Sequence, residues 1–492
     1  MTIDDESGDD RAPWDDKLHE ECGIFGAIGV QDAATFVALG LHALQHRGQE
    51  AGGIVAYDPV EARFNSVRRL GYVRDNFTSA DVMRQLPGQL GIGHVRYSTS
   101  GNKGQTAIRD VQPLYAELAR GGFALAHNGN ITNAEALRAE LIDRGSIFQS
   151  SSDTECIIHL MARSIQRTVA ERMKDALRRV EGAFSLVAMT RTKLIGVRDP
   201  LGVRPLMLGR VGDGWALASE TCAFDIVGAE FVREIEPGEM VVITRDGVHS
   251  ERPFHAAPSK FCVFEYVYFS RPDSVIGGLS VYEARRRIGV ELAREAPVEA
   301  DYICPVPDSG TPAAIGFSQE SGIPFAMGII RNQYVGRTFI EPTDQIRNMG
   351  VRLKLNVNRA LIAGKRVCLV DDSVVRGTTS RKIRDMILEA GAKEVHFRIA
   401  SPPTKWSCFY GVDTPERTKL LAHNMTEEEM ARQLKVDSLR FVSLDGLYRA
   451  TGNPAGRDRH APQYCDACFS GEYPIPPSDR IAAGDLPLRE TA

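Results

Sequence analysis

Two adjacent carboxylates, Asp371 and Asp372, follow the apolar run 367–370, which has the length of a buried strand. A cation, a glycine and three hydroxyl groups come next, at Arg376, Gly377, Thr378, Thr379 and Ser380. Paired carboxylates suit Mg²⁺ or the diol of a ribose, and a bare backbone with nearby hydroxyls suits a phosphate. The purely structural alternative is an acidic turn that ends a strand.

A helix is expected directly after this loop, because Ile383 and Ile387 share one face and Gly391 follows. The order strand, loop, helix places a phosphate at a helix N-terminus, where backbone N–H groups and the positive end of the helix dipole meet it. The stretch 366–380 resembles the phosphoribosyl pyrophosphate (PRPP) loop of type I phosphoribosyltransferases. This resemblance implies PRPP binding by residues 371, 372 and 376–380.

A second loop, PDSG at 307–310, also follows a strand pattern. The same resemblance implies that Ser309, Asp371 and Asp372 touch the Mg²⁺ of Mg–PRPP, because Mg²⁺ prefers few carboxylates plus phosphate oxygens. Residues 331–356 are rich in basic side chains and resemble the mobile loop that closes over PRPP in this family. A plain surface loop is the alternative for that segment.

The thiol of Cys22 is a second reactive group, although by residue type alone it is more often a buried core cysteine than a nucleophile. Five short segments change that judgement: ECGIFG, LQHRGQEAGG, GHVRYSTSG, HNGNITN and SSSDTE, in this order over residues 21–155. Together they resemble the class II glutamine amidotransferase domain, an N-terminal-nucleophile hydrolase.

In that family the cysteine becomes the first residue when a leader is removed. A thiol needs a nearby base, and an α-amine, which titrates near ~8, can serve, whereas the amide of an internal cysteine cannot accept a proton. We therefore predict cleavage between Glu21 and Cys22. The propeptide 1–21 has nine acidic and two basic residues, and we expect it to be disordered as a free segment. A solvated tail with no role is the alternative.

The amidotransferase resemblance also assigns the glutamine-binding groups. Arg96 would clamp the α-carboxylate with two parallel N–H donors, and Asp153 would pair with the α-ammonium. The oxyanion hole would consist of the Asn128 side chain and the Gly129 N–H. Two further neighbours of the glutamine would be Thr99 and His127. Taken alone, Arg96 or Asp153 would more simply be half of a surface ion pair.

Four of the nine cysteines form a further set: Cys262, Cys408 and the CxxC pair Cys465 and Cys468. Four thiolates fit a [4Fe–4S] cluster and a tetrahedral zinc ion equally well. Their positions resemble those of the iron–sulfur branch of the glutamine–PRPP amidotransferases, and this resemblance favours the cluster. Its role would be structural, tying the region near Cys465 to the second domain.

The elements that position these groups follow two patterns. Short apolar runs at 183–189, 194–197 and 240–243 predict the strands of a two-sheet sandwich. Farther along, a helix from 281 to about 296, a strand and loop over 302–312 and a strand at 324–330 predict βαβ units and a parallel sheet. Ligands of such sheets lie beyond the strand C-termini.

The fold class follows from the resemblances: an α+β N-terminal-nucleophile αββα sandwich, then an α/β phosphoribosyltransferase domain with a parallel sheet. The polar, proline-containing stretch 250–260 is the expected linker. The predicted division is a propeptide, a glutaminase domain, a phosphoribosyltransferase domain and a C-terminal tail, at 1–21, 22–255, 256–475 and 476–492.

Composition narrows the class of protein. A chain of 492 residues with 43% hydrophobic and 25% charged residues describes a soluble globular protein of two domains. The net charge of −5 argues against nucleic acid, and no apolar run is long enough to span a membrane. The start lacks the features of a secretory signal, so we expect a cytoplasmic protein with reduced thiols.

Both halves together resemble the glutamine–PRPP amidotransferase family. That implies hydrolysis of glutamine at Cys22 and internal passage of ammonia, which displaces diphosphate from PRPP to give 5-phosphoribosylamine and glutamate, the first step of de novo purine (IMP) synthesis. It also implies feedback inhibition by purine nucleotides and a homo-oligomer, commonly a tetramer.

Two alternatives remain at this stage. One is another class II amidotransferase, such as glucosamine-phosphate synthase or asparagine synthetase, but their second domains lack the DDSVVRGTTS loop. The other is a non-catalytic PRPP-sensing protein, which the complete set of glutaminase residues disfavours.

Overall fold

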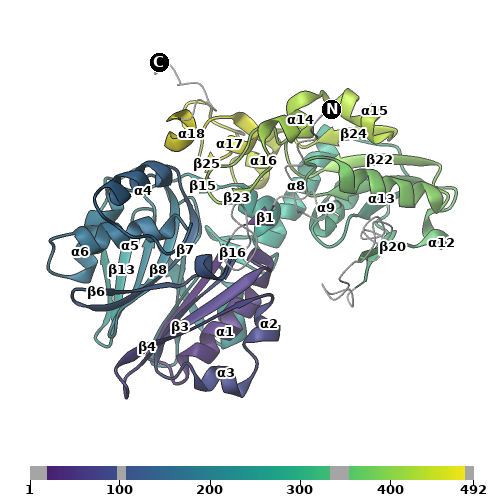
Figure 1. The fold of residues 1–492 in the computed structure, drawn as a ribbon. Coiled ribbons are helices and arrows are strands. Elements are labelled where there is room, and N and C mark those ends of the chain that lie inside the picture. The colour runs from purple at the N-terminus through teal and green to yellow at the C-terminus, as the bar shows by residue number, and fades with distance from the viewer. Residues whose placement is uncertain (1–18, 21, 97–106, 333–353, 483–492) are drawn as a thin grey trace, which may run out of the picture.

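The computed structural model describes residues 19–20, 22–96, 107–332 and 354–482. Thr99, Glu21, most of the predicted propeptide, most of the predicted loop over PRPP and the last ten residues lie outside these ranges. Within them the chain forms two large antiparallel sheets, one parallel sheet and their covering helices, side by side in Figure 1. No helix in the described ranges is both long and apolar enough to cross a membrane.

The first sheet has seven antiparallel strands, and the segment that begins with Cys22 lies at its centre. Buried apolar side chains and glycines dominate the central strands, which explains their position in the core. The strand order is β12 (Glu230–Glu234), β10 (Met207–Val211), β11 (Gly214–Ala218), β2 (Cys22–Ile28), β5 (Leu90–Arg96), β3 (Ala51–Asp58) and β4 (Arg63–Leu70).

The second sheet has six antiparallel strands, among them the three runs predicted from the sequence. Its order is β14 (Gly247–Glu251), β13 (Met240–Thr244), β9 (Leu194–Arg198), β8 (Gly182–Met189), β7 (Gly121–Ile131) and β6 (Leu114–Leu118). All eight residues of β8 are buried, which fits a strand covered on both faces.

The two sheets face each other across a core that includes Ile24, Ile92, Val187 and Leu217. Helices cover both outer faces, which makes the predicted αββα sandwich (Figure 1). The first sheet carries α1 (Ala33–Ala43), α2 (Val73–Asn76), α3 (Ala80–Arg84) and α7 (Cys222–Val227), and the second carries α4 (Ala134–Asp143), α5 (Thr154–Arg163) and α6 (Val169–Leu177).

The second half contains the predicted parallel sheet, in the order β18 (Tyr302–Pro305), β21 (Arg366–Asp371), β22 (Glu394–Ile399) and β24 (Ser438–Phe441). One core cluster packs α8 (Val281–Glu295), α9 (Thr311–Ser321) and α16 (Leu444–Ala450) on one face. A second cluster packs α13 (Thr378–Glu389), α14 (Leu421–Asn424) and α15 (Glu427–Leu434) on the other. The fold class inferred from the sequence is therefore confirmed.

The predicted strand at 324–330 is wrong in extent. Phe325 makes only an isolated bridge to Ile303, and the strand β19 covers Ile329–Arg331. Because the Gly328 N–H bonds back to the Ala326 carbonyl, the chain turns away from the parallel sheet. β19 instead pairs with β20 (Leu355–Val357), so both ends of the predicted loop 331–356 are strand rather than loop, and α12 (Arg359–Ile362) follows.

Two short pairings join segments that are far apart in sequence. β15 (Phe261–Cys262) lies parallel to β25 (Tyr464–Cys465), and β1 (His19–Glu20) lies antiparallel to β23 (Val412–Asp413). After α17 (Ala467–Ser470), the helix α18 (Ser478–Ala482) packs against α4 of the first half (Figure 1). The predicted domain boundaries stay predictions, although residues 478–482 rest on the sandwich rather than hanging free.

Candidate active site

The thiol of Cys22 lies at the start of the central strand β2, where Cys22 is the register partner of Arg96 on β5. Its side chain is almost fully buried yet lines a cavity of ≈ 760 Å³. The same cavity is lined by Arg96, His127, Gly129 and Asp153, which come from three separate motifs of the sequence. The fold thus brings the predicted nucleophile and most of the predicted glutamine-binding residues together.

The predicted oxyanion residues Asn128 and Gly129 lie on β7, paired with β8. Gly129 has a φ of +139°, and a Cβ at this position would stand 2.1 Å from the Ala183 carbonyl oxygen, so only glycine fits. The Asn128 amide is completely buried, and within the described residues neither its nitrogen nor its oxygen has a hydrogen-bond partner. An unsatisfied buried amide costs about 1–3 kcal/mol, which indicates a ligand. Asn128 does not itself line the cavity.

Asp153 stands at the start of α5, where its Oδ2 accepts a hydrogen bond from the Ile131 N–H at 2.9 Å. Its Oδ1 lies 3.7 Å from Nδ1 of His127, which also contacts Thr154 Oγ1 at 3.1 Å. Burial opposes ionisation, but the His127 charge and these hydrogen bonds outweigh it, so the pKa of Asp153 lies below its ordinary value. A carboxylate held ionised here suits an ammonium ligand.

Asp110 and Ser151 are among the cavity residues that the sequence did not predict. Asp110 lies with Oδ2 3.9 Å from Nη2 of Arg96, and it accepts hydrogen bonds from the backbone and hydroxyl of Ser151 at 2.8 and 2.7 Å. Ser151 belongs to the SSSDTE motif, whereas no local pattern around Asp110 pointed to the site. Asp110, held by Ser151, therefore lies beside the Arg96 guanidinium, which is predicted to hold the α-carboxylate of glutamine.

The second half of the chain also lines this cavity, which the sequence did not predict. Its contribution comes mainly from the segment between β22 and α14: Trp406, Ser407, Cys408, Phe409, Gly411, Val412, Asp413, Thr414, Pro415, Glu416, Arg417 and Thr418. The loop 371–380 is not among the described lining residues. The glutamine-binding side is therefore closed by the second half but does not open directly onto the predicted PRPP loop.

The carboxylates of Asp371 and Asp372 lie at the C-terminal end of β21 and are buried. The Ser309 hydroxyl donates to Asp372 Oδ1, and Ser373 donates to Asp372 Oδ2 at 2.7 Å. Because β18 and β21 are parallel neighbours, the loops that follow them meet at one edge of the sheet. The three predicted Mg²⁺ contacts therefore share one site.

The N-terminus of α13 completes this edge. Gly377 precedes the helix with a φ of +76°, and the helix begins at Thr378. Ser380 is buried in the first turn, and the apolar face predicted from the sequence, with Ile383 and Ile387, packs into the core. The predicted strand–loop–helix is confirmed, and it places a helix N-terminus at the edge where Asp371 and Asp372 lie, an arrangement suited to an anion.

Comparison with known proteins identifies the family of this chain. A family profile described as a glutamine amidotransferase domain matches residues 96–225. The amidophosphoribosyltransferase of Rhizobium etli is 55% identical over 467 residues, covering 93% of this chain and 92% of that protein. The chain belongs to the amidophosphoribosyltransferase family.

Other members of the amidophosphoribosyltransferase family agree. The Bacillus subtilis enzyme is 46% identical over 93% of this chain and 94% of its own length. The solved structure of the B. subtilis glutamine PRPP amidotransferase complexed with ADP and GMP superposes with a TM-score of 0.86 at 45% identity, covering 92% of this chain and 98% of that one. Another solved structure, of an allosteric regulatory enzyme of purine biosynthesis, matches equally well, at a TM-score of 0.86.

Membership in the amidophosphoribosyltransferase family confirms the predicted activity: glutamine-dependent transfer of nitrogen to PRPP in purine biosynthesis. It disfavours both alternatives, since the relatives match across the phosphoribosyltransferase half as well as the glutaminase half.

One apolar cavity is lined by the four cysteines predicted to share a ligand, Cys262, Cys408, Cys465 and Cys468. Phe264 and Tyr410 are among its other lining residues. The parallel pairing of β15 with β25 sets Cys262 opposite Cys465. Burial, together with the neighbouring thiols, raises the pKa of Cys465 and Cys468 well above the ordinary value, and burial raises the pKa of Cys262 to about 12. Four thiols gathered around one cavity are a donor set for a cationic group.

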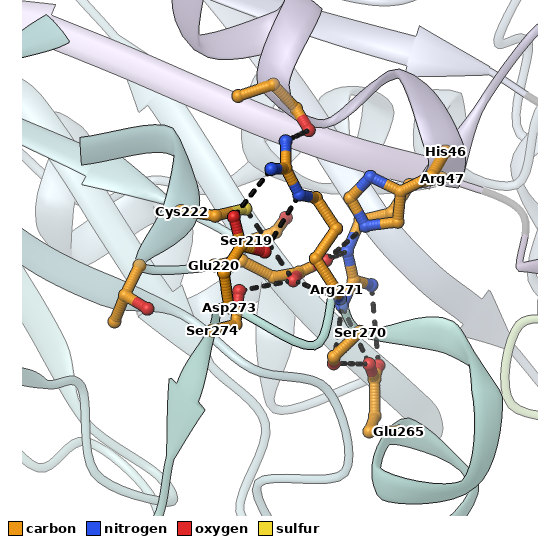
Figure 2. A network of polar contacts seen from close by, with 12 residues as sticks. His46, Arg47, Ser219, Glu220, Cys222, Glu265, Ser270, Arg271, Asp273 and Ser274 are labelled. Atoms are coloured by element: carbon orange, nitrogen blue, oxygen red, sulfur yellow. Dashed lines mark hydrogen bonds and ion pairs between the residues drawn. The ribbon is translucent and has the colours of Figure 1, made fainter. Parts of the chain in front are cut away.

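A buried ion-pair network joins the two halves (Figure 2). Arg47 of the LQHRGQEAGG motif donates to Glu220 and, through Nη2 at 2.7 Å, to Glu265 in the π-helix Glu265–Phe269. Arg204 adds a contact from Nη1 to Glu265 Oε1 at 3.2 Å. Burial alone would raise the pKa of Glu220, but the Arg47 and His46 charges outweigh it and hold that pKa well below its ordinary value. Figure 2 shows Glu220 and Glu265 on either side of Arg47.

Proposed function

We propose that this chain hydrolyses glutamine at Cys22 and passes the ammonia to PRPP held at residues 371–380. The observation that carries the first part is one cavity lined by Cys22, Arg96, Gly129 and Asp153, which the fold assembles from distant motifs. Arg96 would hold the glutamine α-carboxylate, and the ionised Asp153 would hold the α-ammonium. Thr99 and His127 would complete the glutamine contacts; Thr99 lies outside the described residues.

The chemical step begins with attack of the Cys22 sulfur on the glutamine amide carbon. The carbonyl oxygen gains the charge, which the Asn128 amide and the Gly129 N–H would stabilise. The buried Asn128 amide, which has no hydrogen-bond partner among the described residues, supports this role. The carbon–nitrogen bond then breaks, ammonia leaves with a proton from the thiol, and water hydrolyses the thioester to glutamate. The base would be the α-amine of Cys22, which requires removal of residues 1–21.

Ammonia must reach C1 of PRPP, where it displaces diphosphate and gives 5-phosphoribosylamine. Residues 406–409 and 411–418 of the second half line part of the glutamine cavity, which supports internal transfer from one half to the other. An enclosed path would keep ammonia unprotonated and nucleophilic.

PRPP would be bound at the N-terminus of α13 by Arg376, Gly377, Thr378, Thr379 and Ser380. Asp371, Asp372 and Ser309 would hold Mg²⁺, and the hydrogen bonds that already converge on Asp372 support this grouping. When bound, Mg²⁺ would neutralise charge on the leaving diphosphate. The protein's own part is to orient the two carboxylates and to present backbone N–H groups to a phosphate.

We also propose that Cys262, Cys408, Cys465 and Cys468 hold a [4Fe–4S] cluster. The four thiols line one apolar cavity, which supports a shared ligand. Four thiolates would fit a zinc ion as well as a cluster, and the likeness of the four positions to the iron–sulfur branch of the family is what favours the cluster.

Purine nucleotides are the proposed regulators of this enzyme. The B. subtilis relative was solved with ADP and GMP, which supports binding of purine nucleotides as feedback inhibitors here. A homo-oligomer, commonly a tetramer in the family, and a cytoplasmic location stay predictions of the sequence.

The decisive experiment compares Cys22→Ala with Cys156→Ala, in which the replaced cysteine lies on the buried face of α5. Cys22→Ala is expected to lose glutamine-dependent release of diphosphate from PRPP and to keep the reaction with free ammonium, which bypasses the thiol. Cys156→Ala should keep both. Loss of both activities in a folded Cys22→Ala protein would contradict the proposal that Cys22 serves only glutamine hydrolysis and that ammonia reacts at a separate PRPP site.

A second measurement tests the leader and the cluster in the same native preparation. Intact mass is expected to match a chain that begins at Cys22, and iron and sulfide should be present in about equal amounts. Active protein that retains residues 1–21 would refute the amine base. Stoichiometric zinc without sulfide would refute the cluster.

A further inference from the structure

Residues 409–413 of the second half lie directly against the strand that carries the oxyanion residues. A Cβ built at Gly411 would stand 3.0 Å from the Gly129 Cα and 3.1 Å from its carbonyl carbon. One residue farther along β7, the Asn130 side chain donates from Nδ2 to the Phe409 carbonyl oxygen at 3.0 Å. Two successive residues of β7 therefore touch this segment, one by packing and one by a hydrogen bond.

The segment 409–413 is itself held firmly. The Tyr410 carbonyl accepts from Nε of the buried Arg204 at 3.0 Å, and Arg204 in turn contacts Glu265 of the network in Figure 2. The Tyr410 hydroxyl donates to the Ile475 carbonyl and accepts from the Ile475 N–H at 3.0 Å. Because the backbone of residue 410 and its side chain are both anchored, Gly411 cannot drift away from Gly129.

We infer that Gly411 is a positioning residue for glutamine hydrolysis: with the Phe409 carbonyl, it sets where the Gly129 N–H points. This inference rests on the proposed oxyanion role of Asn128 and Gly129. A displacement of about 1 Å in catalytic geometry costs about a hundredfold in rate, and loss of one oxyanion donor costs about 10²–10³. A methyl group at residue 411 would lie 3.0 Å from the Gly129 Cα, closer than ordinary van der Waals contact, so it would push this backbone out of place.

The test uses Gly411→Ala with Gly452→Ala as its matched control. Both glycines have similar left-handed φ angles, +100° and +105°, so the backbone strain is alike, but a Cβ at 452 meets no described atom within 4 Å. Gly411→Ala is expected to lower kcat for glutamine hydrolysis by about tenfold or more with little change in KM. Gly452→Ala should change neither kcat nor KM.

A transition-state readout separates positioning from general damage. The γ-aldehyde analogue of glutamine adds to the Cys22 thiol, forming a carbon–sulfur bond and a tetrahedral centre whose oxygen enters the hole, whereas glutamate binds without that bond. In Gly411→Ala the aldehyde should bind more weakly by the same factor as kcat falls, with glutamate binding unchanged. Equal weakening of both ligands, or unchanged aldehyde binding, would overturn the inference.

Two further variants keep the result interpretable. If Gly411→Ala fails to fold, Asn130→Ala removes the bond to Phe409 and should shift aldehyde binding in the same direction; no shift would overturn the inference. Asn128→Ala tests the underlying assignment. If it leaves aldehyde binding intact, the proposed oxyanion hole is wrong; if it weakens that binding while Gly411→Ala does not, only the positioning role is wrong.

Discussion

At the scale of single residues, the two sites depend on buried polar groups that the fold leaves ready for a ligand. The Asp372 carboxylate receives two hydroxyl donors, and the Asn128 amide receives none from the described residues. His94 shows a related effect: it is completely buried beside the glutamine cavity, with Nε2 3.2 Å from the His127 carbonyl oxygen.

Asp372→Asn is expected to lower the synthesis of phosphoribosylamine from either glutamine or ammonium by about a hundredfold or more, because both need the proposed metal–PRPP site. The KM for PRPP should rise as well. The control is Asp385→Asn on the exposed side of α13, where the carboxylate pairs with Arg384 at 2.6 Å. Equal activity of the two variants would contradict the assignment of Asp372.

His94 predicts a pH dependence of stability. Burial, reinforced by the Arg96 and His127 charges, lowers the pKa of His94 from 6.5 to about 3. Below pH 6.5 the unfolded chain takes up a proton that the folded chain refuses until about pH 3, so stability falls as pH decreases through this window. The slope is about 1.4 kcal/mol per pH unit for one proton.

The measurement compares thermal denaturation midpoints between pH 7 and pH 5. His94→Gln should show a shallower loss of stability on acidification than the parent chain. His249→Gln, at a largely exposed position, should leave the slope unchanged. Identical slopes for all three proteins would show that His94 is protonated in the folded state.

At the scale of elements, the N-terminus of α4 is capped by a residue from far away in the sequence. The helix α4 has no side-chain cap from its own Asn133, and the Asp479 carboxylate of α18 takes that role. It accepts from the Glu135 and Ala136 N–H groups at 2.7 and 3.2 Å. Residues 478–482 therefore stabilise the first half, although the sequence suggested only a tail.

Asp479→Ala should destabilise α4 by about 0.5–2 kcal/mol, the usual effect of losing a cap. Faster hydrogen exchange confined to residues 134–143 would report it. Asp479→Asn keeps an acceptor oxygen and should recover most of the protection. Unchanged exchange in Asp479→Ala would mean that α18 does not cap α4 in solution.

The sequence was informative where a site is built from one continuous stretch. The loop 366–380 was predicted in full, because the strand, the carboxylates, the glycine and the helix pattern are neighbours in the chain. Asp110, Asp479 and residues 406–418 were missed, because they reach their partners only through tertiary packing. The strand predicted at 324–330 was too long, because apolar content alone did not reveal the turn at Gly328.

At the scale of the whole molecule, the two halves share buried charges rather than only apolar contacts. Arg47, Glu265 and Arg204 are completely buried, and the pairs among them cross from the sandwich to the second half. Removal of one member leaves an uncompensated charge in the interior, which costs far more than the loss of an exposed pair.

Glu265→Ala is accordingly expected to lower the free energy of unfolding by about 3–5 kcal/mol. The control is Glu61→Ala, which breaks the exposed pair with Arg63 and should cost no more than about 1 kcal/mol. Thermal denaturation of both variants, with the two activities assayed separately, checks this. Similar small shifts for both would show that the buried charges are hydrated in solution.

The pairing of His19 and Glu20 with the strand Val412–Asp413 bears on whether activation can be reversed. So short a ladder contributes only a few hydrogen bonds, each worth about 0.5–1.5 kcal/mol net, which cannot retain a separate peptide in dilute solution. It persists because covalent continuity keeps the two strands at a high effective concentration. Once the bond before Cys22 is cut, the acidic peptide would diffuse away and dilution would prevent its return, so maturation would be irreversible without any further lock.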